Sequence, residues 1–364
     1  MKKPLHIGFR ADSSLQIGFG HISRCLNIAE EFKKNGDNVV FICRDFENNA
    51  FCMIKDRGFN IISLDRPKKE YVYYSNDLKY ISWLGVDIES EKNDLKTAIR
   101  DKTFDILFFD SYAMDFRLES FARNFAKQIV VIDDLYDRRH NADILIDATL
   151  GRNIDDYKNL VDESCELLLG ANYQPLRSVF ATFRPVALPR RFPPRSILIS
   201  MGGIDTGDFT GEALKALAKS KLKDEKIYVV LSAAAPNIAD RKKAARELDL
   251  NIEWRINEID MPKLILESDL AIGAMGVSSY ERASLGLATI SWAVAENQCG
   301  NFNAFVAKNA IIPISDQGLE KTIEILSESE FRSCEIAAFN ACDASGVKRI
   351  YERVKNAYRN KRDK

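Results

Sequence analysis

The sequence predicts an α/β protein of two Rossmann-like domains, each a parallel sheet wound with helices, facing a central cleft. Its 364 residues exceed the usual size of a single core. Short apolar runs alternate with helical patterns in both halves. A segment rich in proline and arginine, FRPVALPRRFPPR, interrupts this alternation. We therefore expect an N-terminal domain over 1–183, a linker over 184–195, a C-terminal domain over 196–340 and a C-terminal helix over 341–364.

The first half contains six apolar runs of strand length, each followed by a loop or a helical pattern. The first run is followed by a polar loop and then by apolar residues at helical spacing from Ile22 to Phe32, with Gly36 where the helix should stop. This order is typical of a parallel sheet with crossover helices. The expected strands are Leu5–Phe9, Val39–Cys43, Ile61–Leu64, Ile106–Phe109, Ile129–Ile132 and Ile144–Ile146.

The second half repeats the pattern after the proline-rich segment. A helix is expected from about Thr210, and the expected strands are Ser196–Ser200, Ile227–Leu231, Ile252–Trp254 and Leu270–Ile272. The last forty or so residues, rich in Glu, Lys, Arg and Ala, should be helical and lie on the surface. Open parallel sheets bind ligands at the carboxyl ends of their strands, so the candidate site residues are sought in the loops that follow the strands.

The composition excludes several classes of function. Basic and acidic residues number 52 and 53, which gives no electrostatic reason to expect nucleic acid or an anionic membrane as partner. No apolar run approaches the length of a membrane helix and no secretory segment precedes the first strand, so we expect a cytoplasmic protein without membrane insertion. The seven cysteines are scattered without CxxC spacing, so neither disulfides nor a metal site is expected. The oligomeric state stays open, with a monomer as the working expectation.

The loop after the first strand is the strongest candidate for chemistry. In RADSSLQIGFGHISRC, Gly18 and Gly20 lead into a helix that begins with His21, where unpaired N–H groups offer an anion site. The positive end of the helix dipole favours a neutral imidazole that accepts a proton. The alternative is that His21 merely caps the helix or fills a gap. The residues of this segment that we assign to substrate binding are Arg10, Asp12, Gly18, Gly20 and Arg24.

Three loops of the second half suggest a nucleotide site. In GAMGVSSYERASLG a strand ends in glycines before a helix that starts near Ser278, a place suited to a diphosphate. Glu281 either completes a capping box or accepts two hydroxyls of a ribose. The amides of AENQ suit sugar hydroxyls or an acetamido group. The residues assigned to binding here are Gly202, Gly203 and Asp205 in SMGGID, Gly276, Ser278, Ser279 and Glu281, and Gln298.

Competing nucleotide motifs fit poorly. The glycine loop has serine at position 23 in place of the third glycine of a dinucleotide-binding fingerprint, and the second expected strand has no clear ribose-binding acid after it. No GxxxxGK[ST] sequence occurs, which argues against a P-loop enzyme. We therefore expect no cofactor.

Taken together, these motifs resemble a known family. With DSY at 110–112, IDD at 132–134 and LLLGANYQPLR at 167–177, they are similar in kind and order to the UDP-sugar hydrolases of pseudaminic acid biosynthesis, a pathway linked to flagellin glycosylation. The likeness spans nearly the whole chain up to about Gln298. That family is similar in turn to the MurG-like glycosyltransferases of GT-B architecture.

The resemblance implies metal-independent hydrolysis of UDP-2,4-diacetamido-2,4,6-trideoxy-β-L-altropyranose to UDP and the free sugar. By matching motifs, His21 would be the general base on water, Tyr112 would hydrogen-bond near the reacting sugar, and Asn297 would orient substrate or water. Glu281 would hold the ribose. The chain departs from the family pattern at several loop positions, among them Ala113 after the DSY tyrosine, and this leaves the substituents of the sugar open.

Two other classes of function remain open at the level of sequence. A UDP-sugar-dependent glycosyltransferase of the same architecture would use His21 to deprotonate an acceptor hydroxyl in place of water. A nucleotide-sugar-binding protein would show no turnover at all. A hydrolase for a related UDP-diacetamido sugar is a variant of the first reading.

Overall fold

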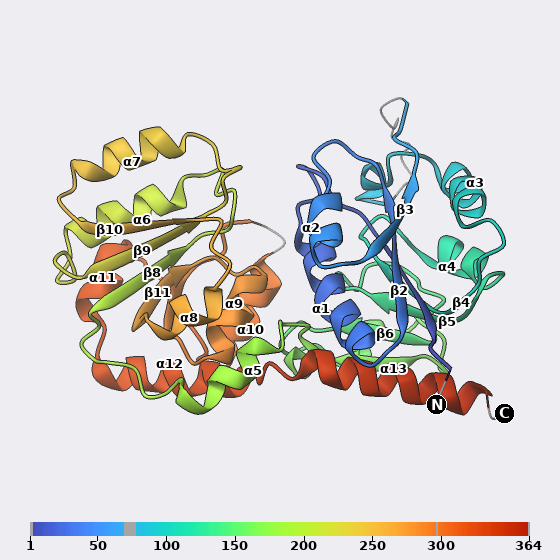
Figure 1. Cartoon of the computed structure of the whole chain (residues 1–364). Coiled ribbons are helices and arrows are strands. Elements are labelled where there is room, and N and C mark those ends of the chain that lie inside the picture. The colour runs from blue at the N-terminus through green and yellow to red at the C-terminus, as the bar shows by residue number, and fades with distance from the viewer. Residues whose placement is uncertain (1–2, 69–77, 296–297, 363–364) are drawn as a thin grey trace. The chain divides into compact units, whose positions relative to one another are not determined.

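The computed structural model describes residues 3–68, 78–295 and 298–362, and it divides into two compact units. Unit 1 runs from the N-terminus to Pro175 and also takes in the chain from Ser345 onward; unit 2 is Leu176–Ala344. Each is a parallel sheet with helices packed against it (Figure 1). The expected α/β fold with two Rossmann-like units is thereby confirmed.

The sheet of unit 1 has the strand order β3-β2-β1-β4-β5-β6-β7. All of its pairings are parallel. The strands are β1 (His6–Ala11), β2 (Asn38–Arg44), β3 (Asn60–Leu64), β4 (Phe104–Asp110), β5 (Ala126–Ile132), β6 (Ile144–Asp147) and β7 (Glu166–Leu169). The helices are α1 (Gly20–Lys34), α2 (Phe51–Asp56), α3 (Ile88–Ile99), α4 (Phe116–Ala122) and α13 (Gly346–Arg362), with short 3₁₀ turns η1 (Ile81–Leu84), η2 (Ile154–Tyr157) and η3 (Ala171–Tyr173).

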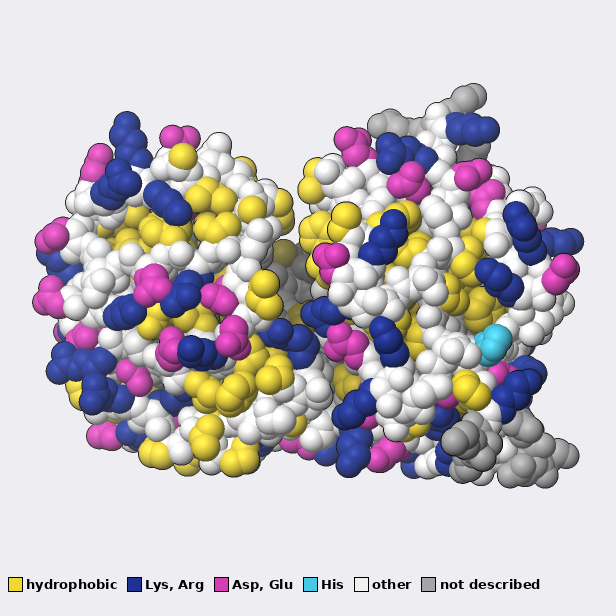
Figure 2. Space-filling model, in the orientation of Figure 1, with side chains coloured by type: hydrophobic (Ala, Val, Ile, Leu, Met, Phe, Trp, Pro, Cys, Tyr) yellow, Lys and Arg dark blue, Asp and Glu magenta, His cyan; other side chains and the backbone are white. Residues whose placement is uncertain are grey.

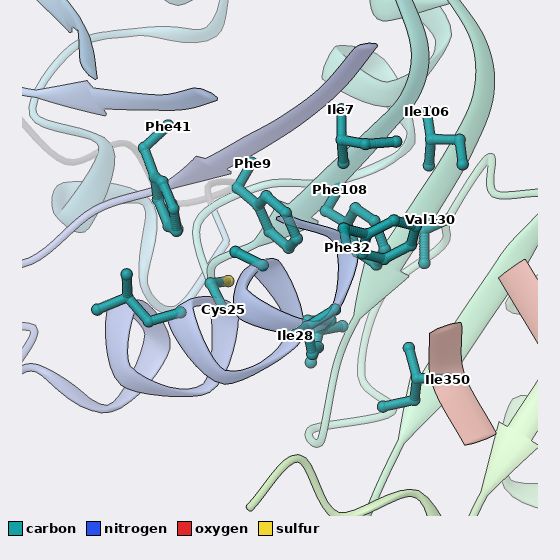
Figure 3. Packing of buried hydrophobic residues seen from close by; sticks show 14 of the residues in the cluster. Ile7, Phe9, Cys25, Ile28, Phe32, Phe41, Ile106, Phe108, Val130 and Ile350 are labelled. Carbon is teal, nitrogen blue, oxygen red and sulfur yellow. The ribbon is translucent and has the colours of Figure 1, made fainter. Parts of the chain in front are cut away.

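The core of unit 1 forms between α1 and the central strands (Figure 3). The ring of Phe9 in β1 stacks on Phe41 of β2 and on Phe108 of β4. Its centroid lies 5.3 Å from that of Phe41 and 4.4 Å from that of Phe108. Cys25 and Phe32 of α1 pack onto these rings from the helix side. Burying large apolar side chains in this way is the main stabilising term of such a layer.

Unit 2 has a six-stranded sheet of order β10-β9-β8-β11-β12-β13. Its strands are β8 (Ser196–Ser200), β9 (Lys226–Leu231), β10 (Asn251–Ile256), β11 (Leu270–Gly273), β12 (Thr289–Ser291) and β13 (Ile312–Pro313). Its helices are α5 (Val179–Phe183), α6 (Phe209–Ala218), α7 (Ile238–Arg246), α8 (Met261–Leu266), α9 (Val277–Ser284), α10 (Cys299–Ala307), α11 (Gly318–Ile325) and α12 (Glu328–Ala341), with the 3₁₀ turn η4 (Arg184–Val186).

The division of the chain differs from the one expected in two places. The units part after Pro175, and the proline-rich segment 184–195 is packed inside unit 2, where buried Arg190 donates hydrogen bonds to four backbone carbonyls. At the other end, α13 returns to unit 1, where Ile350, Val354 and Tyr358 are buried in its core. Only one face of α13 is buried, and its apolar residues form a narrow stripe in an otherwise polar sequence. The composition of this segment therefore predicted a helix on the surface.

Charged side chains of both signs are intermixed on the face of each unit drawn in Figure 2. This agrees with the net charge of −1. Among the described helices, none combines the length and the apolar character needed to cross a membrane.

Candidate functional site

The pairing of β1 with β4 brings two predicted motifs of unit 1 together. Ala11 at the end of β1 lies opposite Asp110 at the end of β4. The loop after β1 turns at Gly18, whose φ of 77° favours glycine, and enters α1 at Gly20. His21, in the first turn of α1, therefore meets Asp110 from the neighbouring strand.

His21 and Asp110 form a buried imidazole–carboxylate pair. Nδ1 of His21 lies 2.6 Å from Oδ1 of Asp110, and the residues are 6% and 1% exposed. A carboxylate only accepts hydrogen bonds, so Nδ1 carries the hydrogen and Nε2 of the neutral ring holds the lone pair. Among the described residues no hydrogen bond reaches Nε2. The pair therefore presents Nε2 as a proton acceptor.

Arg24 supports this pair from one turn further along α1. Its Nε and Nη2 atoms donate to the two carboxylate oxygens of Asp110 at 2.7 Å and 2.6 Å, and its Nη1 donates to Asp134 at 2.9 Å. Burial would raise the pKa of Asp110, but the Arg24 guanidinium and His21 hold it well below its usual range. Because these nitrogen atoms bind carboxylates, we reassign Arg24 from substrate binding to positioning Asp110.

Tyr112 stands beside the imidazole. Its ring centroid is 4.8 Å from that of His21 in an edge-on arrangement. Burial and the neighbouring Asp134 carboxylate raise the pKa of Tyr112 well above its usual value. Its hydroxyl therefore stays protonated and is suited to donating a hydrogen bond rather than accepting a proton.

Arg10 and Asp12 belong to a different buried charge network, with Glu91 and Arg44. Arg10 is fully buried, with Nε 2.8 Å from Oε1 of Glu91 and Nη1 2.6 Å from Oδ1 of Asp12. Asp12 also accepts the backbone N–H of Arg44 at 2.6 Å. Since their charges are used inside the protein, the geometry gives these two residues a structural role, and we remove both from the candidate substrate site.

A second buried network occupies the ends of β5 and β6. His140 contacts Glu119 through Nδ1 at 2.7 Å, and its Nε2 lies 3.8 Å from Asp133. Burial lowers the pKa of His140, but the two carboxylates outweigh burial and raise it to about 9. Asp133 also pairs with Arg138 at 2.8 Å. These pairs join helix α4 to the loop that follows β5.

In unit 2, the loop between β11 and α9 offers backbone donors. Helix α9 begins at Val277 with Gly276 as its N-cap, and no side chain caps it. Within the described chain, the N–H groups of Gly276, Val277 and Ser278 have no acceptor. Three converging N–H groups at a helix start suit an anion such as a diphosphate.

Arg282 lies buried beneath this loop. Its guanidinium donates to the carbonyl of Ala274 at 2.7 Å and to Oγ of Ser278 at 3.2 Å, and the residue is 1% exposed. Gly273 makes room for it, because a Cβ atom there would lie 2.6 Å from Cζ of Arg282. Burial lowers the pKa of Arg282 to about 10, which leaves the side chain charged at neutral pH. Its charge adds to the positive potential at the helix start.

The capping-box alternative for Glu281 is wrong. A capping box with Gly276 as the N-cap needs its acid at the third helical residue, which is Ser279, whereas Glu281 is the fifth residue of α9. Burial raises the pKa of Glu281, with Arg177 and Arg282 opposing the shift. This leaves the ribose role as the remaining proposal for its carboxylate.

Ser279 and Gln298, the two other predicted binding residues of this region, form hydrogen bonds with the backbone of the loop between β11 and α9. Ser279 donates to the carbonyl of Gly276 at 2.7 Å, and the side-chain oxygen of Gln298 accepts the N–H of Met275 at 3.1 Å. Asn301 donates to the carbonyl of Met275 at 2.8 Å. The geometry therefore makes them loop supports. Asn297 lies outside the described residues.

The glycine pair after β8 belongs to the same edge of the unit 2 sheet. Gly202 has a φ of 102°, and the carbonyl of Gly203 accepts the N–H of Ser232 at 2.8 Å. Asp205 accepts the N–H groups of Phe209 and Thr210, both at 3.0 Å, at the start of α6. Its carboxylate is thus occupied by the helix, so we keep Gly202 and Gly203 as ligand-approach candidates and remove Asp205.

The sequence analysis missed residues that the fold brings to the His21–Asp110 pair and to the loop before α9. Arg282 carries no signal except its position in the helix after a glycine loop. Tyr80 and Trp83 belong to an aromatic-rich stretch, YVYYSNDLKYISW, which could have drawn attention. Within the described residues, no group of three or more His, Cys, Asp or Glu side chains is arranged to hold a metal ion.

The chain is similar to two curated proteins of sugar metabolism. It is 27% identical over 265 residues to the UDP-2,4-diacetamido-2,4,6-trideoxy-β-L-altropyranose hydrolase of Campylobacter jejuni, covering 72% of this chain and 82% of that protein. It is 22% identical over 315 residues to the spore coat polysaccharide biosynthesis protein SpsG of Bacillus subtilis, covering 85% and 84%. No protein-family model matches. The resemblance seen in the motifs is thus confirmed at the level of sequence.

Solved structures confirm the fold. MurG of Acinetobacter baumannii matches with a TM-score of 0.63 at 13% identity, over 97% of this chain and all of that one. At this identity the likeness shows the fold alone. The likeness in sequence to the Campylobacter jejuni hydrolase is what supports an enzyme that acts on UDP-sugars.

Proposed function

We propose that this protein hydrolyses a UDP-2,4-diacetamido-2,4,6-trideoxy sugar, UDP-2,4-diacetamido-2,4,6-trideoxy-β-L-altropyranose in the first instance, to UDP and the free sugar. The observation that carries the proposal is the buried His21–Asp110 pair with Nε2 left without a hydrogen bond among the described residues. The motif likeness and the Campylobacter jejuni relative supply the substrate class. The place of the activity would be pseudaminic acid biosynthesis in the cytoplasm.

In this proposal His21 removes the proton from the attacking water. The water oxygen bonds to the anomeric carbon while the bond from that carbon to the β-phosphate oxygen breaks, and its electron pair leaves with UDP. Asp110 stabilises the imidazolium that forms at Nδ1, as a buried carboxylate does in other base-assisted reactions. Such a positioned base commonly contributes a factor on the order of a hundred to ten thousand.

The leaving UDP gains a negative charge, and the loop of α9 is suited to stabilise it. Backbone N–H groups at Gly276 to Ser278 would bind the diphosphate, and the buried Arg282 charge would strengthen their potential. Glu281 would hold the ribose hydroxyls. Tyr112 would hydrogen-bond the sugar near His21, and Asn297 would orient substrate or water. We expect no metal or cofactor to take part.

The test is turnover without an acceptor. Purified protein is incubated with a panel of UDP-diacetamido sugars and with UDP-N-acetylglucosamine, and products are identified by mass spectrometry. We expect equal amounts of UDP and free sugar from a diacetamido substrate. Turnover that appears only when an acceptor alcohol is added would support the glycosyltransferase instead. Binding without turnover under both conditions would support a binding protein.

A further inference from the structure

The aromatic side chains of Tyr80, Trp83 and Tyr112 form a cluster beside the candidate base of unit 1. The indole of Trp83 lies 6.2 Å from the imidazole of His21 and stacks on the ring of Tyr112, with centroids 5.5 Å apart at 25°. Tyr80 contacts both, at 4.9 Å from Trp83 and 5.3 Å from Tyr112. Trp83 and Tyr80 come from the η1 segment, which none of the motifs includes.

The η1 segment holds these rings in place through its other residues. Ile81 and Leu84 are buried in the core of unit 1, whereas Tyr80 and Trp83 are half-buried. The turn ends at Gly85, with a φ of 76°, where a Cβ atom would lie 2.7 Å from the Phe46 ring. The segment is therefore fixed on its core side and keeps part of its aromatic surface exposed beside His21.

We infer that Trp83, supported by Tyr80, is a specificity-determining residue that contacts the apolar face of the sugar whose bond His21 breaks. An aromatic ring favours C–H groups and methyl groups over hydroxyl groups, since it gives hydroxyls little to bond with. A 6-deoxy sugar presents a methyl group where a common hexosamine presents a hydroxymethyl group. Trp83 thus selects the deoxy sugar. This inference rests on the proposed function for its substrate.

The test compares two substrates in three proteins. For wild type, W83A and W83F, kcat/KM is measured with the UDP-diacetamido-trideoxy sugar and with UDP-N-acetylglucosamine. We expect W83A to reduce the preference for the deoxy sugar about ten-fold, mainly through KM, and W83F to keep most of it. The control is W254F, a change at another half-buried tryptophan, on the edge strand β10 of unit 2. An unchanged preference in W83A, whether or not its melting temperature falls, would overturn the inference.

A second measurement keeps the inference testable if the proposed function fails. The chain has three tryptophans, so the double variant W254F/W292F leaves Trp83 as the single emitter. We expect the UDP-diacetamido sugar to change its fluorescence and UDP alone to leave it unchanged. Wild-type protein that hydrolyses no sugar of the panel defeats the proposed function. If the UDP-sugar also leaves Trp83 emission unchanged, the sugar contact is wrong as well; a specific change would uphold it.

Discussion

At the carboxyl edge of the unit 1 sheet, His21, Asp110 and Arg24 form close pairs, whereas the loop before α9 in unit 2 holds backbone N–H groups over the buried guanidinium of Arg282. In unit 1 the imidazole of His21 is tied to Asp110, and Asp110 to Arg24. In unit 2 the loop before α9 leaves three N–H groups without acceptors among the described residues. Paired side chains suit the movement of a proton, and open donors suit the binding of an anion. The proposed function accordingly assigns the chemistry to unit 1 and nucleotide binding to unit 2.

Replacing the base should give the largest effect. His21→Asn removes the lone pair at Nε2, and we expect kcat to fall by about a thousand-fold or more. The affinity for UDP should stay unchanged, because the proposed nucleotide contacts lie in unit 2. Steady-state kinetics and calorimetric UDP titration measure the two quantities separately. Weakened UDP binding with normal kcat would reverse the assignment of roles.

Changing the partner of the base should have the next largest effect. Asp110→Asn replaces the carboxylate that orients Nδ1–H and stabilises the imidazolium, so we expect kcat to fall roughly a hundred-fold or more. Cys25→Ala is the control for packing, because the buried Cys25 thiol also donates to Asp110 and has no role in the proposed reaction. Equal losses in both variants would show that Asp110 matters only for structure.

Disturbing the charge beneath the α9 loop should weaken nucleotide binding. Arg282→Met removes the guanidinium, and Gly273→Ala displaces it by crowding Cζ. We expect UDP affinity to fall about ten-fold in each, which corresponds to about 1.4 kcal/mol, while uridine affinity changes little. Arg282→Lys should recover part of the loss. Equal weakening of UDP and uridine would instead indicate a collapsed loop.

The last prediction concerns the stability of the fold and leaves the reaction aside. The pKa of His140 is raised from 6.5 to about 9, so its charged form stabilises the fold fully below pH 6.5, and this stabilisation is lost as the pH rises through 9. We expect the free energy of unfolding to drop by on the order of 2 to 3 kcal/mol between pH 6.5 and 10. Urea titrations of wild type and His140→Gln measure it. A variant with the same pH dependence as wild type would remove His140 from this role.

The sequence was sufficient for most of the sheet and for part of the site. Apolar runs predicted the strands that became β1 to β6 and β8 to β11, and β8 has the expected bounds. The edge strand β13 is only two residues long, which is too short for an alternation of apolar and polar residues to predict it. At the site, the glycine loop before the first helix led to His21 and the family resemblance led to Tyr112, and the structure brings these two residues together. The sequence led us to place Arg10 and Asp12 at the substrate. A charged residue at the end of a strand gives the same sequence pattern whether it faces solvent or a buried partner such as Glu91.

The most direct test of the central claim is the fate of the water oxygen. The protein turns over the UDP-diacetamido-trideoxy sugar in water enriched in oxygen-18, with no acceptor, and the products are analysed at once by mass spectrometry. We expect one heavy oxygen in the free sugar, above the level that free sugar acquires by exchange, and none in UDP. The His21→Asn variant, incubated under the same conditions, should form neither UDP nor free sugar. A heavy oxygen in the β-phosphate of UDP, or undiminished turnover by His21→Asn, would contradict the account.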